Sequence, residues 1–196
     1  NKYNWAPLDA AVKNAVDLGA SEILYTLGST PLWAASDKNS ALGLYGPGSN
    51  THPQKNSYYT DYLKAVATKY PQITAFQVWN EANLKDFYLG TPKQMAKLTK
   101  DAKKALRSVG SRAKLVAAST TVRSDGPVGK FGKAYGKAMK KKKAWKYVDA
   151  VSAHAVVIAA VTVGSAHVPA FRCHMYVEAP FRVLQDVFEI AALVVR

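Results

Sequence analysis

The chain has 196 residues, of which 48% are hydrophobic and 11% aromatic; this predicts one globular domain with a sizeable core and excludes an intrinsically disordered protein. Its 27 Lys and Arg residues against 13 Asp and Glu residues give a net charge of +14. The single cysteine, Cys173, excludes an intramolecular disulfide and leaves the redox compartment open.

The positive charge is a candidate nucleic-acid-binding surface. The densest run is KAMKKKK at 137–143, where a predicted helix ends. Lysines at a helix C-terminus face solvent and interact favourably with the helix dipole. No nucleic-acid motif accompanies them, so we predict a solvated face and no nucleic-acid partner. The longest apolar run, 155–161, is too short to span a bilayer, so we predict no membrane partner.

Helix and strand patterns alternate along the chain. The first helix is predicted at 6–19, because Pro7 suits a first helical turn and Gly19 a C-terminal cap. The first strand follows at 21–27, and a long loop rich in polar residues, Gly and Pro follows at 28–56. The later elements are helices at 57–71, 91–110 and 130–146 and strands at 73–79, 113–119 and 148–154.

This alternation predicts an α/β fold, with a parallel sheet and right-handed crossover helices. In such folds the binding sites lie at the carboxyl ends of the strands. Polar and aromatic residues gather there after every predicted strand. They include Ser29, Thr30 and Trp33, then Asn80, Glu81 and Asn83, then Ser119 and Thr120, and finally Ser152 and His154.

The segment FQVWNEANL, 76–84, shows this pattern most clearly. A strand suited to burial ends in the carboxylate of Glu81, flanked by Asn80 and Asn83. A buried, unpaired carboxylate is costly, so Glu81 lies either at a solvated mouth or at a position held for chemistry. Adjacent strand residues point to opposite faces, so Asn80 and Glu81 reach one ligand only if the strand is distorted or ends there.

Four segments in chain order resemble retaining glycoside hydrolases of the large (β/α)8-barrel clan, with β-xylosidase and cellulase-like members as the most similar type. They are TLGSTPLWAAS, YYTDYLKAVATKYPQITAFQVWNEANL, LVAAST and VDAVSAHA. In that clan the fourth strand ends in Asn-Glu. The resemblance, over about residues 5–156, therefore implies that Glu81 is the general acid/base and that Asn80 binds the sugar 2-hydroxyl. It implies a carbohydrate substrate and a partial (β/α)8, or TIM, barrel with parallel strands.

The chemistry of glycoside cleavage accounts for these residue types. A carboxyl group with a raised pKa can protonate a poor leaving group, and a retaining enzyme uses a second carboxylate as its nucleophile. Trp33 and Trp79 could stack on sugar rings or pack within the protein, and His154 could contact the substrate or be a structural group. His52, in a polar loop, is expected at the surface. The sequence has neither the clustered spacing of metal ligands nor a phosphate-binding loop, so we predict no metal and no other cofactor.

The resemblance also has limits. If Glu81 ends strand four, then strands one and two are missing, and we expect an incomplete barrel over residues 1–155. The tail at 156–196 matches no familiar pattern and contains no lysine, so we interpret it as unrelated or out of frame. It replaces the strand that carries the nucleophile, and Glu178 and Glu189 are the only candidates left. Its stretch 155–163 could cover a sheet edge as a substitute strand.

Two hypotheses therefore stay open. The chain is either the catalytic part of a glycosidase or a non-catalytic α/β fragment with at most a carbohydrate-binding rim. A second carboxylate within reach of Glu81 would distinguish them. Asn1 begins neither a basic segment nor an apolar leader, so no signal peptide is expected and the chain reads as cut from a longer one. Many members of the family are secreted, but the localisation and the oligomeric state stay unknown.

Overall fold

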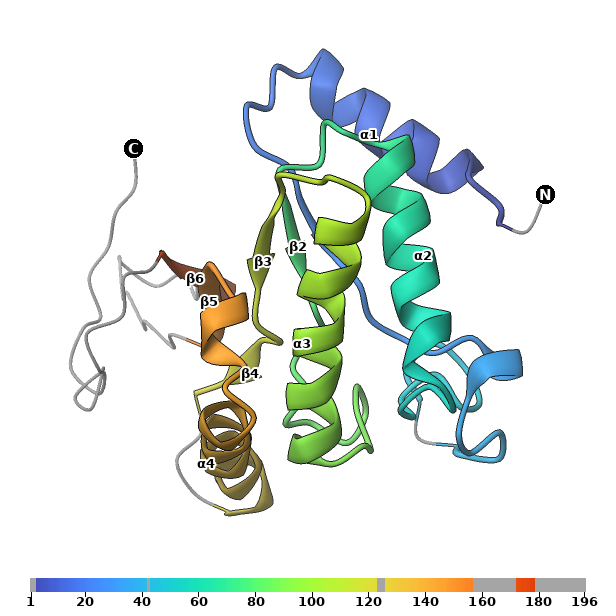
Figure 1. Cartoon of the computed structure of the whole chain (residues 1–196). Helices are drawn as coiled ribbons and strands as arrows, with labels where there is room; N and C mark the ends of the chain where they lie inside the picture. The colour runs from blue at the N-terminus through green and yellow to red at the C-terminus, as the bar shows by residue number, and fades with distance from the viewer. Residues whose placement is uncertain (1–2, 42, 123–125, 157–171, 179–196) are drawn as a thin grey trace, which may run out of the picture.

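A computed structural model describes residues 3–41, 43–122, 126–156 and 172–178 (Figure 1). The predicted alternation of helices and strands is confirmed. The helices are α1 (Ala6–Asp17), α2 (Asn56–Lys69), α3 (Pro92–Ser108) and α4 (Gly126–Lys141), with 3-10 turns at Leu32–Ala34 and Trp145–Tyr147. The strands are β1 (Leu24–Thr26), β2 (Ala75–Gln77), β3 (Lys114–Val116), β4 (Thr120–Thr121), β5 (Ala150–Val156) and β6 (Arg172–Glu178).

Strands β1 to β5 form a parallel sheet, as predicted. The order is β1-β2-β3-β5, and β4 continues along the same edge of β5 as β3. Val116 pairs with Ala150, 34 positions later in the sequence, whereas Thr120 pairs with Ala153, only 33 positions later. The segment between β3 and β4 therefore carries one more residue than the facing part of β5.

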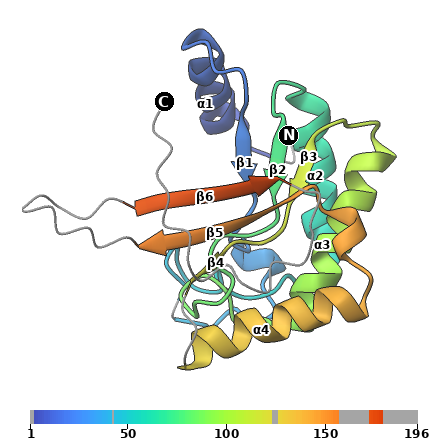
Figure 2. The ribbon, with the colours of Figure 1, turned by 90° about the vertical axis from the view of Figure 1, so that its left-hand side faces the viewer.

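Strand β6 is the exception to the parallel prediction. It pairs antiparallel with β5, from Ala150 opposite Glu178 to Val156 opposite Arg172 (Figure 2). The tail thus does cover this edge of the sheet, but with residues 172–178 instead of the predicted 155–163. Of that predicted stretch, 155 and 156 belong to β5 and the remainder lies outside the described residues.

Helices α2 and α3 lie side by side along one face of the sheet, and α4 packs against α3 at an angle (Figures 1 and 2). The strand register aligns Tyr25, Phe76 and Leu115 in one row. These side chains pack in the core with apolar residues of the helices, which include Leu63, Val66, Leu98, Leu106 and Met139. The alternate residues form a smaller cluster of Ala75, Val116 and Ala150, on the face that points inward in a closed barrel.

The ends of the helices follow local capping rules. Thr91 caps α3 in a capping box with Gln94, as its position before Pro92 predicts. Three helices end in the same pair of backbone hydrogen bonds, a Schellman motif. The residue after the C-cap has a positive φ in each case: Gly19 at 76°, Gly110 at 69° and Lys143 at 50°. The bonds are Gly19 to Val16 and Ala20 to Ala15, Gly110 to Arg107 and Ser111 to Leu106, and Lys143 to Lys140 and Ala144 to Met139.

Candidate active site

The backbone is distorted just where β2 ends. The amide of Ser119 donates to the carbonyl of Trp79 at 3.0 Å, and the amide of Ala82 donates to the carbonyl of Ser119 at 2.9 Å. In a regular parallel ladder one residue bonds to partners two positions apart. Here the partners are three apart, so Asn80 and Glu81 together oppose the single residue Ser119. This is a β-bulge, a feature that re-aims side chains next to active sites.

The bulge places Glu81 in an unusual conformation. Its φ is 40°, in the left-handed region that costs most residues other than glycine roughly 1–2 kcal/mol. Its amide donates to Oγ of Ser119 at 2.8 Å. Ser29, which follows β1, has a φ of 64°. Two of the three non-glycine residues with positive φ in the described part of the chain thus lie at the carboxyl edge of the sheet.

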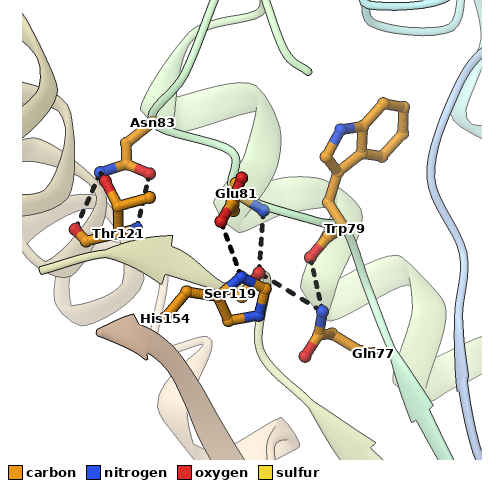
Figure 3. A network of polar contacts seen from close by, with 7 residues as sticks. All are labelled: Gln77, Trp79, Glu81, Asn83, Ser119, Thr121 and His154. Carbon is orange, nitrogen blue, oxygen red and sulfur yellow. Dashed lines mark hydrogen bonds and ion pairs between the residues drawn. The ribbon is translucent and has the colours of Figure 1, made fainter. Parts of the chain in front are cut away.

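The Glu81 carboxylate is buried and paired with a histidine. Its Oε1 lies 2.8 Å from Nδ1 of His154, which reaches it from β5 (Figure 3). Glu81 is only 6% exposed, and no other acidic residue is buried in the part of the chain that the structure describes. With Glu81 ionised, Nδ1–H of His154 donates to it. The structure therefore brings together two of the predicted site residues from strands that are distant in sequence.

The two other amides of this region have different surroundings. Asn83 forms three hydrogen bonds with Thr121 of β4: its Oδ1 accepts from the Thr121 amide at 2.9 Å, and its Nδ2 donates to the carbonyl and to Oγ1, each at 3.0 Å (Figure 3). It ties the turn after Glu81 to β4. Asn80, which is half-buried, lines a cavity of about 370 Å³ together with Thr26, Gly28, Ser29, Tyr45, Trp79 and Phe87. Of the two amides, Asn80 is thus the one that faces open space.

A larger cavity of about 610 Å³ adjoins the first. Both share Gly28, Ser29 and Trp79, and the larger one is rich in aromatic residues, which include Trp33, Tyr58, Tyr59 and Tyr62. Trp33 is 57% exposed, and its ring centroid lies 5.0 Å from that of Tyr58. Neither Glu81 nor His154 lines either cavity. The cavities thus lie beside the buried carboxylate and leave it covered.

Trp79 is buried among aromatic residues in this structure. It is 1% exposed, its ring contacts those of Tyr59 and Tyr88, and its Nε1 donates to the carbonyl of Phe87 at 2.9 Å. Trp79 also lines both cavities, so its role in stacking on a sugar ring stays a prediction. Trp33 is the tryptophan that presents a ring to solvent.

The prediction that His52 lies at the surface is wrong. The side chain is 8% exposed, with Nδ1 2.9 Å from the Tyr88 hydroxyl and Nε2 3.0 Å from Oδ1 of Asn56. Asn56 in turn donates to Asp101 of α3 at 2.7 Å. Burial lowers the pKa of His52 below its ordinary value, although the bond to Asn56 opposes this shift. His52 joins the long loop to α2 and α3.

Sequence reasoning noted Ser119 only as a polar residue after a strand. Its double contact with the bulge, through the backbone and through Oγ, has no signature in the segment LVAAST. Within the described residues, no group of three or more His, Cys, Asp or Glu side chains could hold a metal ion. The helices of the same residues include none that is long and apolar enough to cross a membrane.

No known protein family and no curated protein matches this sequence. Among solved structures, a monomeric β-xylosidase from Caulobacter crescentus CB15 matches with a TM-score of 0.59 and 19% identity, over 78% of this chain and 30% of its own. The catalytic domain of GH30 xylanase C from Talaromyces cellulolyticus matches with a TM-score of 0.57 and 16% identity, over 78% of this chain and 37% of its own. The GH39 enzyme from Xanthomonas axonopodis pv. citri matches with a TM-score of 0.53 and 20% identity, over 78% of this chain and 29% of its own.

These likenesses identify the fold. The chain shares the α/β architecture of (β/α)8-barrel glycoside hydrolases, in an incomplete form, and it spans about a third of the length of these structures. The predicted fold class is confirmed.

Proposed function

We propose that this chain is the part of a retaining glycoside hydrolase that carries the general acid/base, Glu81. The main support is a buried carboxylate on a β-bulge at the carboxyl edge of a parallel sheet, 2.8 Å from His154. A positioned Glu side chain is one of the groups that serve as general acid and base in enzymes. The shared fold with glycoside hydrolases supports the same role.

In this mechanism Glu81 acts twice. It first protonates the glycosidic oxygen while a second carboxylate attacks the anomeric carbon and forms a glycosyl-enzyme. It then takes a proton from the water that hydrolyses this intermediate. Asn80, at the wall of the smaller cavity, is proposed to bind the sugar 2-hydroxyl, and Trp33 to stack on a further sugar ring. His154 is proposed to donate to the Glu81 carboxylate and to fix its orientation.

The second carboxylate belongs to a residue other than Glu178. The strand register pairs Glu178 with Ala150, at the amino end of β5, whereas His154 lies four residues further along. At ~3.3 Å per residue, this separates the two positions by roughly 13 Å along the sheet. A retaining enzyme needs its two carboxyl groups about 5–5.5 Å apart. Glu189 lies outside the described residues.

The proposed substrate is a β-linked xylosyl oligosaccharide. Two of the similar structures are named as a xylosidase and a xylanase, and Asn80 and Trp33 line adjoining cavities that could hold adjacent sugar rings. The alternative is a non-catalytic fragment that binds such sugars without cleaving them. Its support is the position of Glu178, which leaves Glu81 without an identified nucleophile in the described residues.

The test compares the wild type with Glu81→Gln, in this chain and in any longer protein that contains it, on xylo-oligosaccharides and aryl β-xylosides. For this chain alone we expect little or no turnover. Where turnover occurs, Glu81→Gln should lower it about 10²–10⁴-fold on oligosaccharides. The loss in the glycosylation step should be smaller with good aryl leaving groups, because they need less proton assistance.

Binding of the same oligosaccharides, measured by calorimetry, separates the two hypotheses. The non-catalytic alternative predicts that the wild type and Glu81→Gln both bind the oligosaccharides and that neither cleaves them. An unimpaired Glu81→Gln enzyme on an oligosaccharide would refute the acid/base role. Conversely, clear turnover by this chain that disappears in the variant would mean that the catalytic pair is complete.

A further inference from the structure

Ser119 is a fully buried residue that contacts the whole length of the bulge. Its amide and carbonyl bond to Trp79 and Ala82, and its hydroxyl accepts from the amide of Glu81. We propose that Ser119 is the positioning residue of the candidate active site, which holds the Glu81 carboxylate against His154 through the backbone. Its catalytic consequence rests on the proposed function, whereas its structural part does not.

The argument begins with the backbone donors of the bulge. An extra residue in a strand leaves one amide without a partner in the ladder. The amides of Asn80 and Glu81 lie between the ladder bonds to Trp79 and from Ala82, and that of Glu81 is the one directed at Ser119. A buried, unsatisfied amide is strongly unfavourable, and Ser119 Oγ, at 2.8 Å, satisfies it. The bulge and the hydroxyl therefore depend on each other.

The conformation of Glu81 supplies the second step. At a φ of 40° the residue occupies a region that L-residues adopt only when their surroundings hold them there. Without the bond from its amide to Ser119, Glu81 would relax toward negative φ, which rotates the Cα–Cβ bond. The carboxylate would then leave its position 2.8 Å from Nδ1 of His154.

Gln77 completes the arrangement around the hydroxyl. Its Nε2 lies 3.4 Å from Ser119 Oγ and also donates to the carbonyl of Trp79 at 3.2 Å (Figure 3). A hydroxyl accepts two hydrogen bonds, so the Glu81 amide and Gln77 use both lone pairs of Ser119. Ser119 lines neither of the two cavities described above, which distinguishes it from Asn80 and Trp33.

The experiment is NMR spectroscopy on the ¹⁵N-labelled chain, and it requires no activity. It compares the wild type with Ser119→Ala, with Ser119→Thr, which keeps the hydroxyl, and with Thr99→Val. Thr99 has an equally buried hydroxyl in α3, where it bonds to Met95 and Tyr135, so its replacement controls for general destabilisation. The two readouts are hydrogen exchange of the Glu81 amide and the ring ¹⁵N shifts of His154.

We expect Ser119→Ala to accelerate exchange of the Glu81 amide at least ~10-fold relative to its neighbours and to shift the His154 ring signals. Thr99→Val should change neither, and Ser119→Thr should restore both toward the wild type. Wild-type signals for both groups in Ser119→Ala would overturn the proposal. If Ser119→Ala does not fold, Ser119→Cys, which has a similar shape and is a weaker acceptor, takes its place with the same expected outcome.

Kinetics add a second arm wherever the wild type turns over substrate. Misplacement of the carboxylate should lower kcat on xylo-oligosaccharides about 10²-fold with little change in KM, and less on aryl xylosides with good leaving groups. Absence of turnover in a longer protein that contains this chain counts against the proposed function, and the NMR readouts then test Ser119 by themselves. A uniform loss on all substrates, together with unchanged His154 signals, would count against Ser119.

Discussion

At the residue scale, polar side chains at the carboxyl edge of the sheet serve two purposes. Glu81 and Asn80 lie at the candidate site, whereas Asn83 and Ser119 hold the chain that presents them. No buried side-chain nitrogen or oxygen of the described residues lacks a hydrogen-bond partner. The strained conformation of Glu81 is therefore surrounded by satisfied groups, as expected where the surroundings hold such a conformation in place.

His52 leads to a prediction about stability and pH. Its pKa is lowered in the folded chain, so the unfolded chain binds a proton first as the pH falls. Stability from this residue is therefore complete above the ordinary histidine pKa, about 6.5, and is lost as the pH falls through the lowered value. We expect the free energy of unfolding to fall between pH 7.5 and pH 5.5, by up to ~1.4 kcal/mol per pH unit.

Urea unfolding at the two pH values measures this effect. His52→Gln, which stays neutral at both, should be less stable at pH 7.5 but lose less stability on acidification. The groups that face His52, directly or through Asn56, are Tyr88, Asn56, Asp101 and Lys97. Equal pH dependence in the two proteins would contradict the assignment.

The sequence drew attention to Asn80 and Glu81, whose catalytic roles stay predictions, but not to the residues that support them. Asn80 and Glu81 stand out because a carboxylate and an amide at the end of an apolar strand contradict its burial. His52 is buried by partners at positions 56 and 88, which only the fold brings near it. The bulge is equally invisible, because it depends on the register between residues 79–82 and Ser119.

At the scale of the elements, the helix ends offer an internal comparison. Gly19 and Gly110 occupy the left-handed position after α1 and α3, and Lys143 occupies the same position after α4. Glycine avoids the steric cost that a side chain meets there. We therefore expect Lys143→Gly to raise the free energy of unfolding by about 1 kcal/mol, with a small opposing loss of charge at the helix C-terminus.

Denaturant unfolding of three variants tests this expectation. Lys143→Ala controls for the loss of charge and should be neutral or slightly destabilising, whereas Gly110→Ala should destabilise by about 1 kcal/mol. Stabilisation of equal size in Lys143→Gly and Lys143→Ala would show that charge, and not backbone conformation, is the cause.

The elements themselves were largely predictable from local patterns. Helix α1 was predicted together with Pro7 in its first turn and Gly19 after its end, because Pro and Gly at helix ends act locally. Helix α4 begins at Gly126, earlier than predicted, and residues 145–147 form a separate 3-10 turn. Strands β4 and β6 were missed because β4 has two residues and β6 owes its place to pairing with β5.

At the scale of the whole molecule, the two edges of the sheet differ. Among the described residues, β1 pairs only with β2, while β6 covers the opposite edge at β5. An uncovered edge presents backbone donors and acceptors to other chains. The half-exposed side chain of Leu24 on β1 adds apolar surface there. The division of the chain into a barrel part (1–155) and a tail (156–196) stays a prediction. Strand β5 extends across this position to Val156, and β6 joins the same sheet.

The antiparallel register of β6 predicts a disulfide. Cys173 lies directly opposite Ala155, and opposed residues in antiparallel strands have Cα atoms about 4.5–5.5 Å apart, within the range for disulfides. Since Cys173 is the only cysteine, Ala155→Cys should form a single intramolecular bridge on mild oxidation. Mass spectrometry after alkylation would detect it.

Ala153→Cys is the matched control. Residue 153 lies opposite Met175, two positions away from Cys173, so it should remain alkylated under the same conditions. A bridge in the control but not in Ala155→Cys would mean that the register is shifted by two residues. A bridge in neither would contradict the pairing of β6 with β5.

The direction of β6 also determines the route of the polypeptide. Each parallel strand leads the chain to the carboxyl ends of the strands, where Glu81 lies. A helix then returns the chain to the amino ends. Strand β6 runs in the opposite direction. It ends at Glu178 beside Ala150, at the amino end of β5 and therefore at the end of the sheet remote from Glu81. To travel back along a seven-residue strand takes about 23 Å, or seven extended residues. In the sequence Glu189 is eleven positions beyond Glu178, more than the seven that such a distance requires, so Glu189→Gln is the variant to pair with Glu81→Gln wherever turnover is found.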